Sequence, residues 1–272
     1  MTPGPERKLS ERMATRAITD GTELVLVRCG ETALNVAGRT QGSDESPFSV
    51  LTAKGVAQAE ALGWRLLRSG NKPITALYSS PLVCARETAQ AILAGRPATE
   101  PAVPMHTEAR LTERNYGVID GLTSEEVSVR YAEVAATMLA ADDNWAPPGG
   151  ESCAEVRKRA MAALAAIAKR HPGKRVLVVT HAEVVANIGD DITGGSRRLS
   201  MKNAALSLIR WDHGRWSLVL WNDAGEFCVG CRPGYYIVDT AAALRLLGVG
   251  VLAGSLLGLG IGAVLARGRS RR

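Results

Sequence analysis

Reactive and polar side chains follow three apolar runs of the sequence, and their types suit phosphate chemistry. The first run ends in Arg28 and Cys29, the second ends in Ser79 and Ser80, and the third ends in His181. A guanidinium binds phosphate oxygens through paired donors, a thiolate is a nucleophile or a metal ligand, and an imidazole moves protons. These residues together predict an anion-binding site that carries a nucleophile.

The elements that must position these side chains alternate along the chain. Hydrophobic spacing predicts buried strands over 23–28, 74–80 and 174–181, and helices over 52–70, 85–93 and 152–171. Residues 204–211 and 215–222 alternate in polarity and predict a hairpin at the sheet edge. This order indicates an α/β protein of three α/β/α layers with a largely parallel sheet. Because ligands of such sheets gather at the carboxyl ends of strands, the three polar strand ends should converge.

Composition limits the class of protein. The chain has 272 residues, of which 46% are hydrophobic and 22% charged, and this suits one globular domain with appendages. The net charge of +6 comes from basic residues crowded at the two ends, and aromatic residues are only 4%, so we expect no nucleic-acid partner. The start lacks an apolar signal segment, which favours a reducing compartment, with an organelle transit peptide as the alternative. The isolated pair Cys228 and Cys231 does not predict a zinc site.

Several segments resemble, in order, the motifs of the histidine phosphatase superfamily, the phosphoglycerate mutase-like proteins. The segment "LVRCGETALN" resembles L-V-R-H-G-E-T-x-x-N, "GRTQG" and "LTAKGVAQA" follow it, and "LYSSPLVCARETA" is similar to S-S-P-L-x-R-A-x-E-T-A. The segments "LTERNYGVIDGLTSEEV", "PPGGES" and "VLVVTHA" complete the series, which covers residues 23–207. The resemblance implies the phosphoglycerate mutase-like fold.

The resemblance also implies covalent phosphoryl transfer. In the family a histidine attacks phosphorus, two arginines and a second histidine surround the phosphoryl oxygens, and a glutamate protonates the leaving oxygen. By matching positions, Arg28 is the first arginine, His181 is the second histidine and Glu113 is the acid. Thr32 and Asn35 belong to the phosphate loop. The resemblance implies no metal and no cofactor.

Two central positions depart from the family pattern. Cys29 stands at the nucleophilic histidine, and Cys84 stands at the second phosphate-binding arginine. The first change removes the imidazole that carries the phosphoryl group, and the second removes a bidentate cation whose loss can cost orders of magnitude in rate. We therefore expect a catalytically impaired domain, a pseudo-phosphatase that binds a phosphorylated small molecule or phosphoprotein or serves as a scaffold.

Other interpretations remain open at this stage. Cys29 can act as a thiolate nucleophile in a working phosphomonoester phosphatase, since a neighbouring Arg lowers a thiol pKa. Cys29, Cys84 and His181 can instead have a new redox or metal role. Phosphoglycerate mutase activity is less favoured, because the segment between Tyr116 and Pro147 is short, as in the phosphatase branch.

The C-terminal region predicts a membrane span. The run 246–266 carries no charge and is flanked by Arg245 and Arg267. Its helical length of about 30 Å matches a bilayer's hydrocarbon core. Glycines recur every four residues along one face, which is typical of helices that associate in lipid; they are Gly250, Gly254, Gly258 and Gly262. We expect a lipid-bilayer partner and a homo-oligomer formed through these glycines.

We therefore divide the chain into five parts. They are a flexible basic arm over 1–20, a phosphatase-like domain over 21–225, a linker over 226–244, a transmembrane helix over 245–267 and a basic tail over 268–272. The basic tail favours a cytoplasmic C-terminus by the positive-inside rule. Because we find no signal that would carry the domain across, we prefer the alternative orientation, a single-pass tail anchor with the domain in the cytosol and the basic tail on the other side of the membrane.

Overall fold

A six-stranded sheet forms the centre of the protein. The computed structural model describes residues 21–43, 46–67, 72–96, 101–139, 142–195 and 201–224. The strands are β1 (Thr22–Arg28), β2 (Ile74–Ser79), β3 (Met105–Thr107), β4 (Arg175–Thr180), β5 (Leu206–Asp212) and β6 (Arg215–Asp223). Their order in the sheet is β3-β2-β4-β1-β5-β6.

The sheet is mixed but mostly parallel. Strands β3, β2, β4 and β1 run parallel to their neighbours, whereas β5 pairs antiparallel with both β1 and β6. The predicted hairpin is present, with His213 and Gly214 in its turn at positive φ. Only its second strand lies at the edge, since β5 is inserted between β1 and β6.

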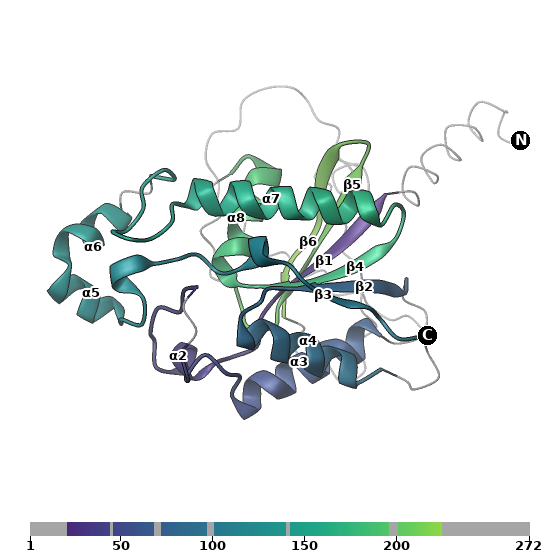
Figure 1. Ribbon diagram of the computed structural model, residues 1–272, viewed down its shortest axis with the longest axis horizontal. Helices are drawn as coiled ribbons and strands as arrows, with labels where there is room; N and C mark the ends of the chain where they lie inside the picture. Colours follow the sequence, from purple (N-terminus) through teal and green to yellow (C-terminus); the bar gives the residue numbers. More distant parts are fainter. Residues whose placement is uncertain are drawn as a thin grey trace, which may run out of the picture. The chain divides into compact units, whose positions relative to one another are not determined.

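Helices cover both faces of the sheet, as the sequence predicted. In Figure 1, α3 (Ala53–Leu66) and α4 (Val83–Ala94) lie below the sheet, and α7 (Cys153–Arg170) and α8 (Ala182–Thr193) lie above it. Successive residues of a strand point to opposite faces. Leu24 and Leu26 therefore join the core with α7 and α8, and Val25 and Val27 join the core with α3 and α4.

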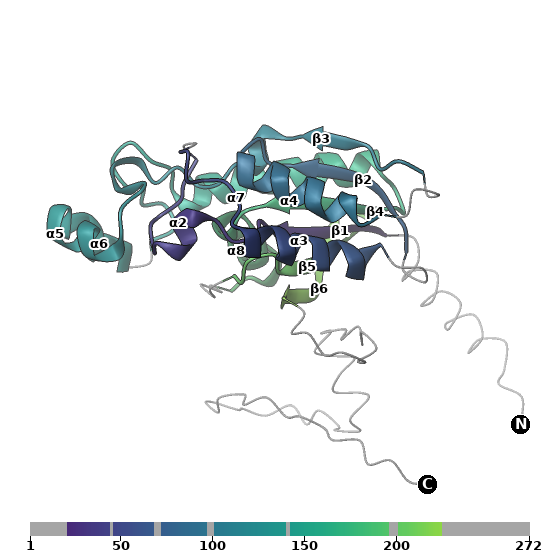
Figure 2. The same ribbon diagram turned by 90° about the horizontal axis from the view of Figure 1, so that it is seen from below.

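Short elements gather beyond the carboxyl ends of the parallel strands. They are α2 (Ala33–Val36), η1 (Ala109–Leu111), η2 (Gly117–Ile119), α5 (Ser124–Arg130) and α6 (Ala132–Leu139). Figure 2 shows α2, α5 and α6 at one end of the layered structure. The sequence patterns did not predict these elements, nor β3 and α8. Conversely, α3 ends at Leu66, before the predicted stop at Gly70.

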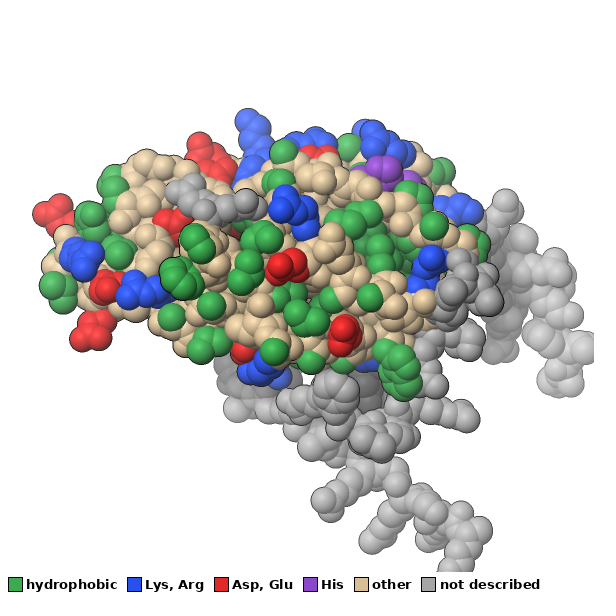
Figure 3. Space-filling model, turned by 60° about the horizontal axis from the view of Figure 1, so that its bottom comes forward, with side chains coloured by type: hydrophobic (Ala, Val, Ile, Leu, Met, Phe, Trp, Pro, Cys, Tyr) green, Lys and Arg blue, Asp and Glu red, His purple; other side chains and the backbone are tan. Residues whose placement is uncertain are grey.

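The outer face of α2, α3 and α4 is chemically mixed. Figure 3 shows hydrophobic side chains scattered among acidic and basic ones on this side of the molecule. The exposed apolar residues include Val36, Val56 and Trp64. Isolated exposed apolar residues are common on soluble domains, so this face indicates no particular ligand.

The predicted membrane span lies outside the described residues. In the six ranges that the structure describes, no helix has both the length and the hydropathy needed to cross a bilayer. The basic arm, the linker, the span with its four glycines and the basic tail all fall in ranges that are not described. Those predictions therefore stay predictions.

Candidate active site

The three polar strand ends lie side by side. In the sheet register Arg28 is opposite Thr180, and Ser79 is opposite Val179. The backbone N–H of Cys29 donates to the Thr180 carbonyl at 2.9 Å, and the N–H of Ser80 donates to the Val179 carbonyl at 2.9 Å. The sheet register thus places Cys29, Ser80 and His181, each of which follows one of these strands, at the same edge of the sheet.

Two thiols face one imidazole nitrogen at this end of the sheet. The Sγ of Cys29 lies 3.8 Å from His181 Nδ1, and the Sγ of Cys84 lies 3.9 Å from the same nitrogen. The three ligand atoms are all within 4.8 Å of one another. The exposed fractions are 5% for Cys29, 0% for Cys84 and 4% for His181. Three residues that the sequence analysis assigned to the site, Cys29, Cys84 and His181, therefore form one buried cluster.

Polar side chains hold this cluster from outside. Ser80 Oγ lies 2.7 Å from His181 Nε2, and the amide Nε2 of Gln41 donates to Cys84 Sγ at 3.7 Å. Ser80 Oγ also accepts the N–H of Leu82 at 3.3 Å. Because an imidazole has two distinct nitrogens, the direction of the Ser80 bond sets which atom of His181 carries its proton.

The two thiols are not electrostatically equivalent. Hydrogen bonding from Cys84, then from His181, lowers the pKa of Cys29 well below its ordinary value, with help from the charges of His181 and Arg28, although burial opposes the shift. The pKa of Cys84 is raised because it donates to Cys29, and because of burial and the charges of Cys29 and Glu113. The two shifts are opposite in direction, so Cys29 is the more easily ionised of the two thiols.

Glu113 is buried near the cluster, and among the residues that the structure describes its carboxylate forms no salt bridge. Its Oε1 accepts the N–H of Arg114 at 2.8 Å, and its Oε2 accepts the N–H of Glu183 at 3.3 Å. Burial raises the pKa of Glu113, and the nearby Glu183 charge adds to that rise, while the His181 charge opposes it. A buried carboxyl with a raised pKa is suited to proton donation.

Arg159 anchors the loop that presents Glu113. Its guanidinium donates to the carbonyls of Arg110 at 2.8 Å, Thr112 at 2.6 Å and Glu113 at 3.1 Å. It also pairs with both carboxylate oxygens of Glu151 at 2.9 Å. These bonds occupy its donors, so Arg159 positions the loop.

Thr32 and Asn35 shape the loop that follows β1. Thr32 caps α2, and the two side chains accept each other's backbone N–H at 3.2 Å. Thr32 Oγ1 donates to Gln41 Oε1 at 2.6 Å, and Asn203 Nδ2 donates to Asn35 Oδ1 at 2.9 Å. Hydrogen bonds therefore connect Thr32 to Gln41 and Asn35 to Asn203.

The arginines near the cluster have partners of their own. Arg28 donates through Nη1 to the carbonyl of Met201, while its charge still lowers the pKa of Cys29. Arg86 is exposed and donates to the Pro81 carbonyl at 2.7 Å. Arg86 therefore does not occupy the place of the arginine that the motif expects at position 84.

A close backbone contact packs the loop after β1 onto α3. A Cβ added to Gly30 would lie 2.5 Å from the Gly55 carbonyl oxygen, and one added to Gly55 would lie 2.2 Å from the Glu31 carbonyl oxygen. Both distances are shorter than any real Cβ contact, so these two positions require glycine.

Some residues of the site were not predicted. Gln41 contacts both Thr32 and Cys84, and Thr88 accepts the N–H of Gly30 at 3.0 Å while donating to the Cys84 carbonyl at 2.7 Å. Both lie inside quoted motif segments, "GRTQG" and "ARETA". Both residues are polar and lie in segments that resemble family motifs, and this was the signal that the sequence offered. Their contacts depend on tertiary packing.

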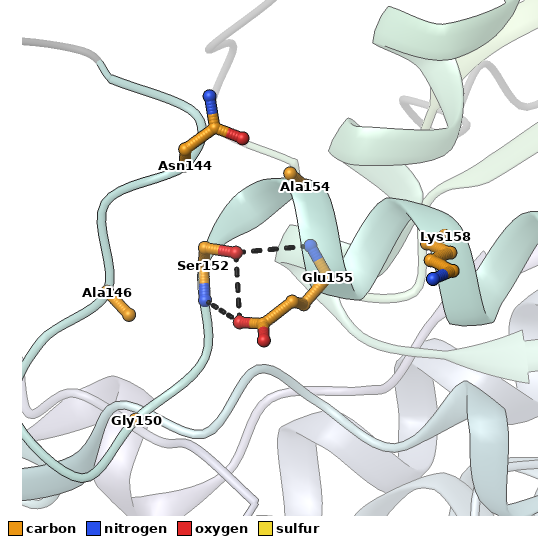
Figure 4. A pocket seen from close by; sticks show the side chains of 7 residues that line it. All are labelled: Asn144, Ala146, Gly150, Ser152, Ala154, Glu155 and Lys158. Carbon is orange, nitrogen blue, oxygen red and sulfur yellow. Dashed lines mark hydrogen bonds between the residues drawn. The ribbon is translucent and has the colours of Figure 1, made fainter.

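A separate surface pocket lies at the start of α7. Figure 4 shows it beside the Ser152 cap, where Ser152 and Glu155 exchange hydrogen bonds of 2.8–3.2 Å. Its lining residues come from the 144–158 segment and include none of the predicted site residues. Ser152 and Glu155 bond to each other as a capping box at the start of α7. Their polar groups are therefore explained by helix capping, and we assign no catalytic role to this pocket.

Known proteins resemble this chain over most of its length. A family model described as the histidine phosphatase superfamily (branch 1) matches residues 24–224. A metal-independent phosphoserine phosphatase of Arabidopsis thaliana is 35% identical over 81% of this chain and 90% of its own length. Phosphoglycerate mutase-like protein 4 of the same plant is 32% identical over 76% and 87%. The solved structure of the YhfR protein of Bacillus stearothermophilus has a TM-score of 0.66 and 31% identity, over 74% of this chain and 97% of that one.

Proposed function

Because the chain belongs to the histidine phosphatase superfamily (branch 1), we propose that it keeps the family's phosphate-binding architecture with an impaired reaction centre. Its role is then to bind a phosphorylated small molecule or phosphoprotein, or to act as a scaffold. The observation that carries this proposal is the pair of thiols, Cys29 and Cys84, on one nitrogen of His181. No phosphohistidine can form at position 29, and the bidentate cation expected at position 84 is replaced by a neutral group.

The surroundings of the thiols support the same proposal. Arg28 donates to the Met201 carbonyl, and Arg86 is directed to the surface. Phosphoryl transfer depends on cations that neutralise charge on the equatorial oxygens. With cysteine at position 84, the cluster lacks the second arginine that such a transfer uses.

A phosphate-release assay tests this proposal. The full chain, purified in detergent, is assayed with p-nitrophenyl phosphate, phosphoserine and 3-phosphoglycerate beside Cys29→Ser and the double variant Cys29→His/Cys84→Arg. We expect wild type and Cys29→Ser to equal the blank, and the double variant to exceed wild type by on the order of 10³-fold, because an arginine at phosphoryl oxygens has that value. Cys29→Ala/Cys84→Arg is the matched control without a nucleophile at position 29 and should remain inactive.

Turnover by wild type that is lost in Cys29→Ser would overturn the proposal. Far-UV circular dichroism and thermal unfolding check that each variant folds, because position 84 is fully buried. If the double variant unfolds, the comparison of wild type with Cys29→Ser still decides the question.

A second candidate is a thiol phosphatase, and the placement of Cys29 between Arg28 and His181 favours it. In that reaction the Cys29 thiolate attacks phosphorus and forms an S–P bond as the bond from phosphorus to the leaving oxygen breaks. Glu113 gives its proton to the leaving oxygen, and water then attacks the phosphocysteine and releases phosphate. Trapping a phosphocysteine on Cys29 by acid quench and mass spectrometry would establish this reaction, and its absence in active enzyme would exclude it.

We also propose that residues 245–267 anchor the protein in a bilayer and associate through their glycine face. The uncharged run and the four-residue glycine spacing support this proposal. Carbonate extraction of membranes should leave wild type in the pellet and move Leu252→Arg/Leu256→Arg to the supernatant. Cross-linking should give oligomers that Gly254→Leu/Gly258→Leu reduces and that Val251→Leu retains. An extractable wild type would exclude the anchor.

A further inference from the structure

The buried cluster of Cys29, Cys84 and His181 has the composition of a metal site. The three side chains come from different parts of the fold: the loop after β1, the first turn of α4 and the residue before α8. Their Sγ, Sγ and Nδ1 atoms lie within 4.8 Å of one another. Side chains so distant in the sequence meet here because three parallel strands end at one edge of the sheet.

We propose that Cys29, Cys84 and His181 bind a thiophilic metal ion, with Zn²⁺ as the ion that fits best. Two thiolates and one imidazole are a donor set for zinc, and three protein ligands leave a fourth tetrahedral position for water or an anion. In the bound state the two thiolate charges balance the two charges of the divalent cation. On binding, any proton still on either sulfur leaves to solvent, and two S–Zn bonds and one N–Zn bond form.

The groups around the cluster also suit this role. In a metal-bound state, a proton on His181 Nε2 would bond to Ser80 Oγ, which lies 2.7 Å away, and Nδ1, the nitrogen that both sulfurs face, would bind the ion. The Gln41 amide, 3.7 Å from Cys84 Sγ, donates to that sulfur as it would to a thiolate. Outer hydrogen bonds that orient ligands in this way are a regular part of metal sites.

The atoms need only a small movement to coordinate. Distances of 3.8 and 3.9 Å separate each sulfur from Nδ1, whereas Zn–S and Zn–N bonds of about 2.3 and 2.1 Å place tetrahedral ligands roughly 3.5–3.8 Å apart. Cys84 is on the first turn of α4 and Cys29 is on a loop, and the difference to be closed is only a few tenths of an ångström for each sulfur–nitrogen pair. The site is therefore close to its bound geometry.

Metal binding by the full chain tests the proposal. The protein is stripped with a chelator under reducing conditions and titrated with Zn²⁺, and bound metal is measured after gel filtration. All samples carry Cys228→Ser/Cys231→Ser, which removes the separate C-x-x-C pair. We expect one Zn²⁺ per chain, a rise in the thermal unfolding temperature with Zn²⁺, and thiolate-to-cobalt charge-transfer absorption when Co²⁺ is used as the probe.

Single variants show which residues bind the ion. Cys29→Ser, Cys84→Ser and His181→Ala should each weaken Zn²⁺ binding by more than about 100-fold, because loss of an outer hydrogen-bond partner alone costs about 10–100-fold. Cys153→Ser is the matched control, because Cys153 is a free cysteine at the start of α7, and it should bind Zn²⁺ as wild type does. Comparison with Ser80→Ala, expected to weaken binding by less, separates ligand from positioning roles.

Absence of stoichiometric Zn²⁺, or binding that survives both Cys29→Ser and Cys84→Ser, would overturn the proposal. A disulfide between Cys29 and Cys84 in the reduced preparation, found by mass spectrometry, would overturn it as well. These readouts do not involve phosphate release. The metal site can therefore be present or absent whether or not wild type hydrolyses phosphomonoesters.

Discussion

The buried polar groups at the two ends of β1 have different kinds of partners. At the amino end, buried Glu23 accepts from Arg175 at 2.8 Å and from Arg210 at 3.1 Å, with Lys72 Nζ at 3.8 Å. At the carboxyl end, Cys29 lies near another thiol and a histidine, and within the described ranges the buried carboxyl of Glu113 accepts hydrogen bonds from the backbone N–H groups of Arg114 and Glu183. The buried carboxylate at the amino end is thus paired with cations, whereas the hydrogen-bond donors to the buried Glu113 carboxyl at the other end are neutral backbone groups.

This difference distinguishes an ion-pair cluster that stabilises the fold from the end of the sheet where a ligand can bind. The Glu23 carboxylate has a cationic donor on each oxygen, so its charge and hydrogen-bonding capacity are balanced within the protein. The carboxyl end keeps soft or protonatable groups that a ligand can satisfy, as is usual where binding sites form in α/β sheets. Glu23 and Glu113 show this contrast for the same type of side chain: arginines donate to the first, and backbone N–H groups donate to the second.

The largest expected effect comes from breaking the amino-end cluster. Arg175→Met leaves Glu23 with Arg210 and Lys72 only and should lower the free energy of unfolding by about 3 kcal/mol, since an unbalanced buried charge is costly. Urea unfolding of wild type, Arg175→Met and Glu23→Gln/Arg175→Met measures this. The double variant should recover most of the loss. A loss below about 1 kcal/mol in Arg175→Met would mean that this pair behaves like a surface ion pair.

At the carboxyl end, packing rather than charge should decide stability. Gly55→Ala places a Cβ 2.2 Å from the Glu31 carbonyl oxygen and should lower the free energy of unfolding by about 2 kcal/mol, the usual cost of overpacking. Gly95→Ala is the matched control, because its nearest atoms are 3.9 and 4.0 Å from the added Cβ and its φ of −76° suits alanine. It should be neutral or slightly stabilising. Equal losses in both variants would contradict the close contact.

The two glutamates should give opposite pH dependences. Burial works to raise the pKa of Glu23, but hydrogen bonding and charge from Arg175, then the charge of Lys72 and the Arg210 hydrogen bond, lower it overall. Its stabilising contribution is therefore present above pH 4.5, the unfolded value, and is lost as pH falls through the lower folded pKa. Burial raises the pKa of Glu113, so its contribution is present below pH 4.5 and is lost as pH rises through the folded pKa.

Urea unfolding of Glu23→Gln and Glu113→Gln across acidic to neutral pH measures these slopes. The stability of wild type relative to Glu23→Gln should fall toward low pH, and relative to Glu113→Gln it should fall toward high pH. Slopes of the same sign would remove the contrast between the two ends.

The smallest effect is expected at an exposed ion pair near the site. Lys54 Nζ lies 2.6 Å from Glu31 Oε2, but the Lys54 side chain is 69% exposed. Lys54→Ala should lower the free energy of unfolding by less than about 1 kcal/mol. A larger loss would show that charge, and not only packing, stabilises the loop after β1.

Much of the site was predictable from the sequence because strand ends in parallel sheets must meet. The apolar runs before Arg28, Ser79 and His181 became β1, β2 and β4, and the motif order indicated the family that the family model matches. The elements that the sequence missed lack a local pattern. In α8, Gly189 interrupts the helical spacing, and only the tertiary fold brings Trp221 within 2.3 Å of its would-be Cβ.

The sequence by itself determined the α/β layers, the family and the presence of cysteines at positions 29 and 84, because these follow from local periodicity and motif order. Only the tertiary structure decided that both sulfurs reach the same nitrogen of His181, that Gln41 and Ser80 support them, and that Arg159 holds the Glu113 loop. The physical reason is that side-chain direction depends on χ angles and on packing between elements distant in the chain. Residue types give the chemistry that is available, and the fold sets which atoms face each other.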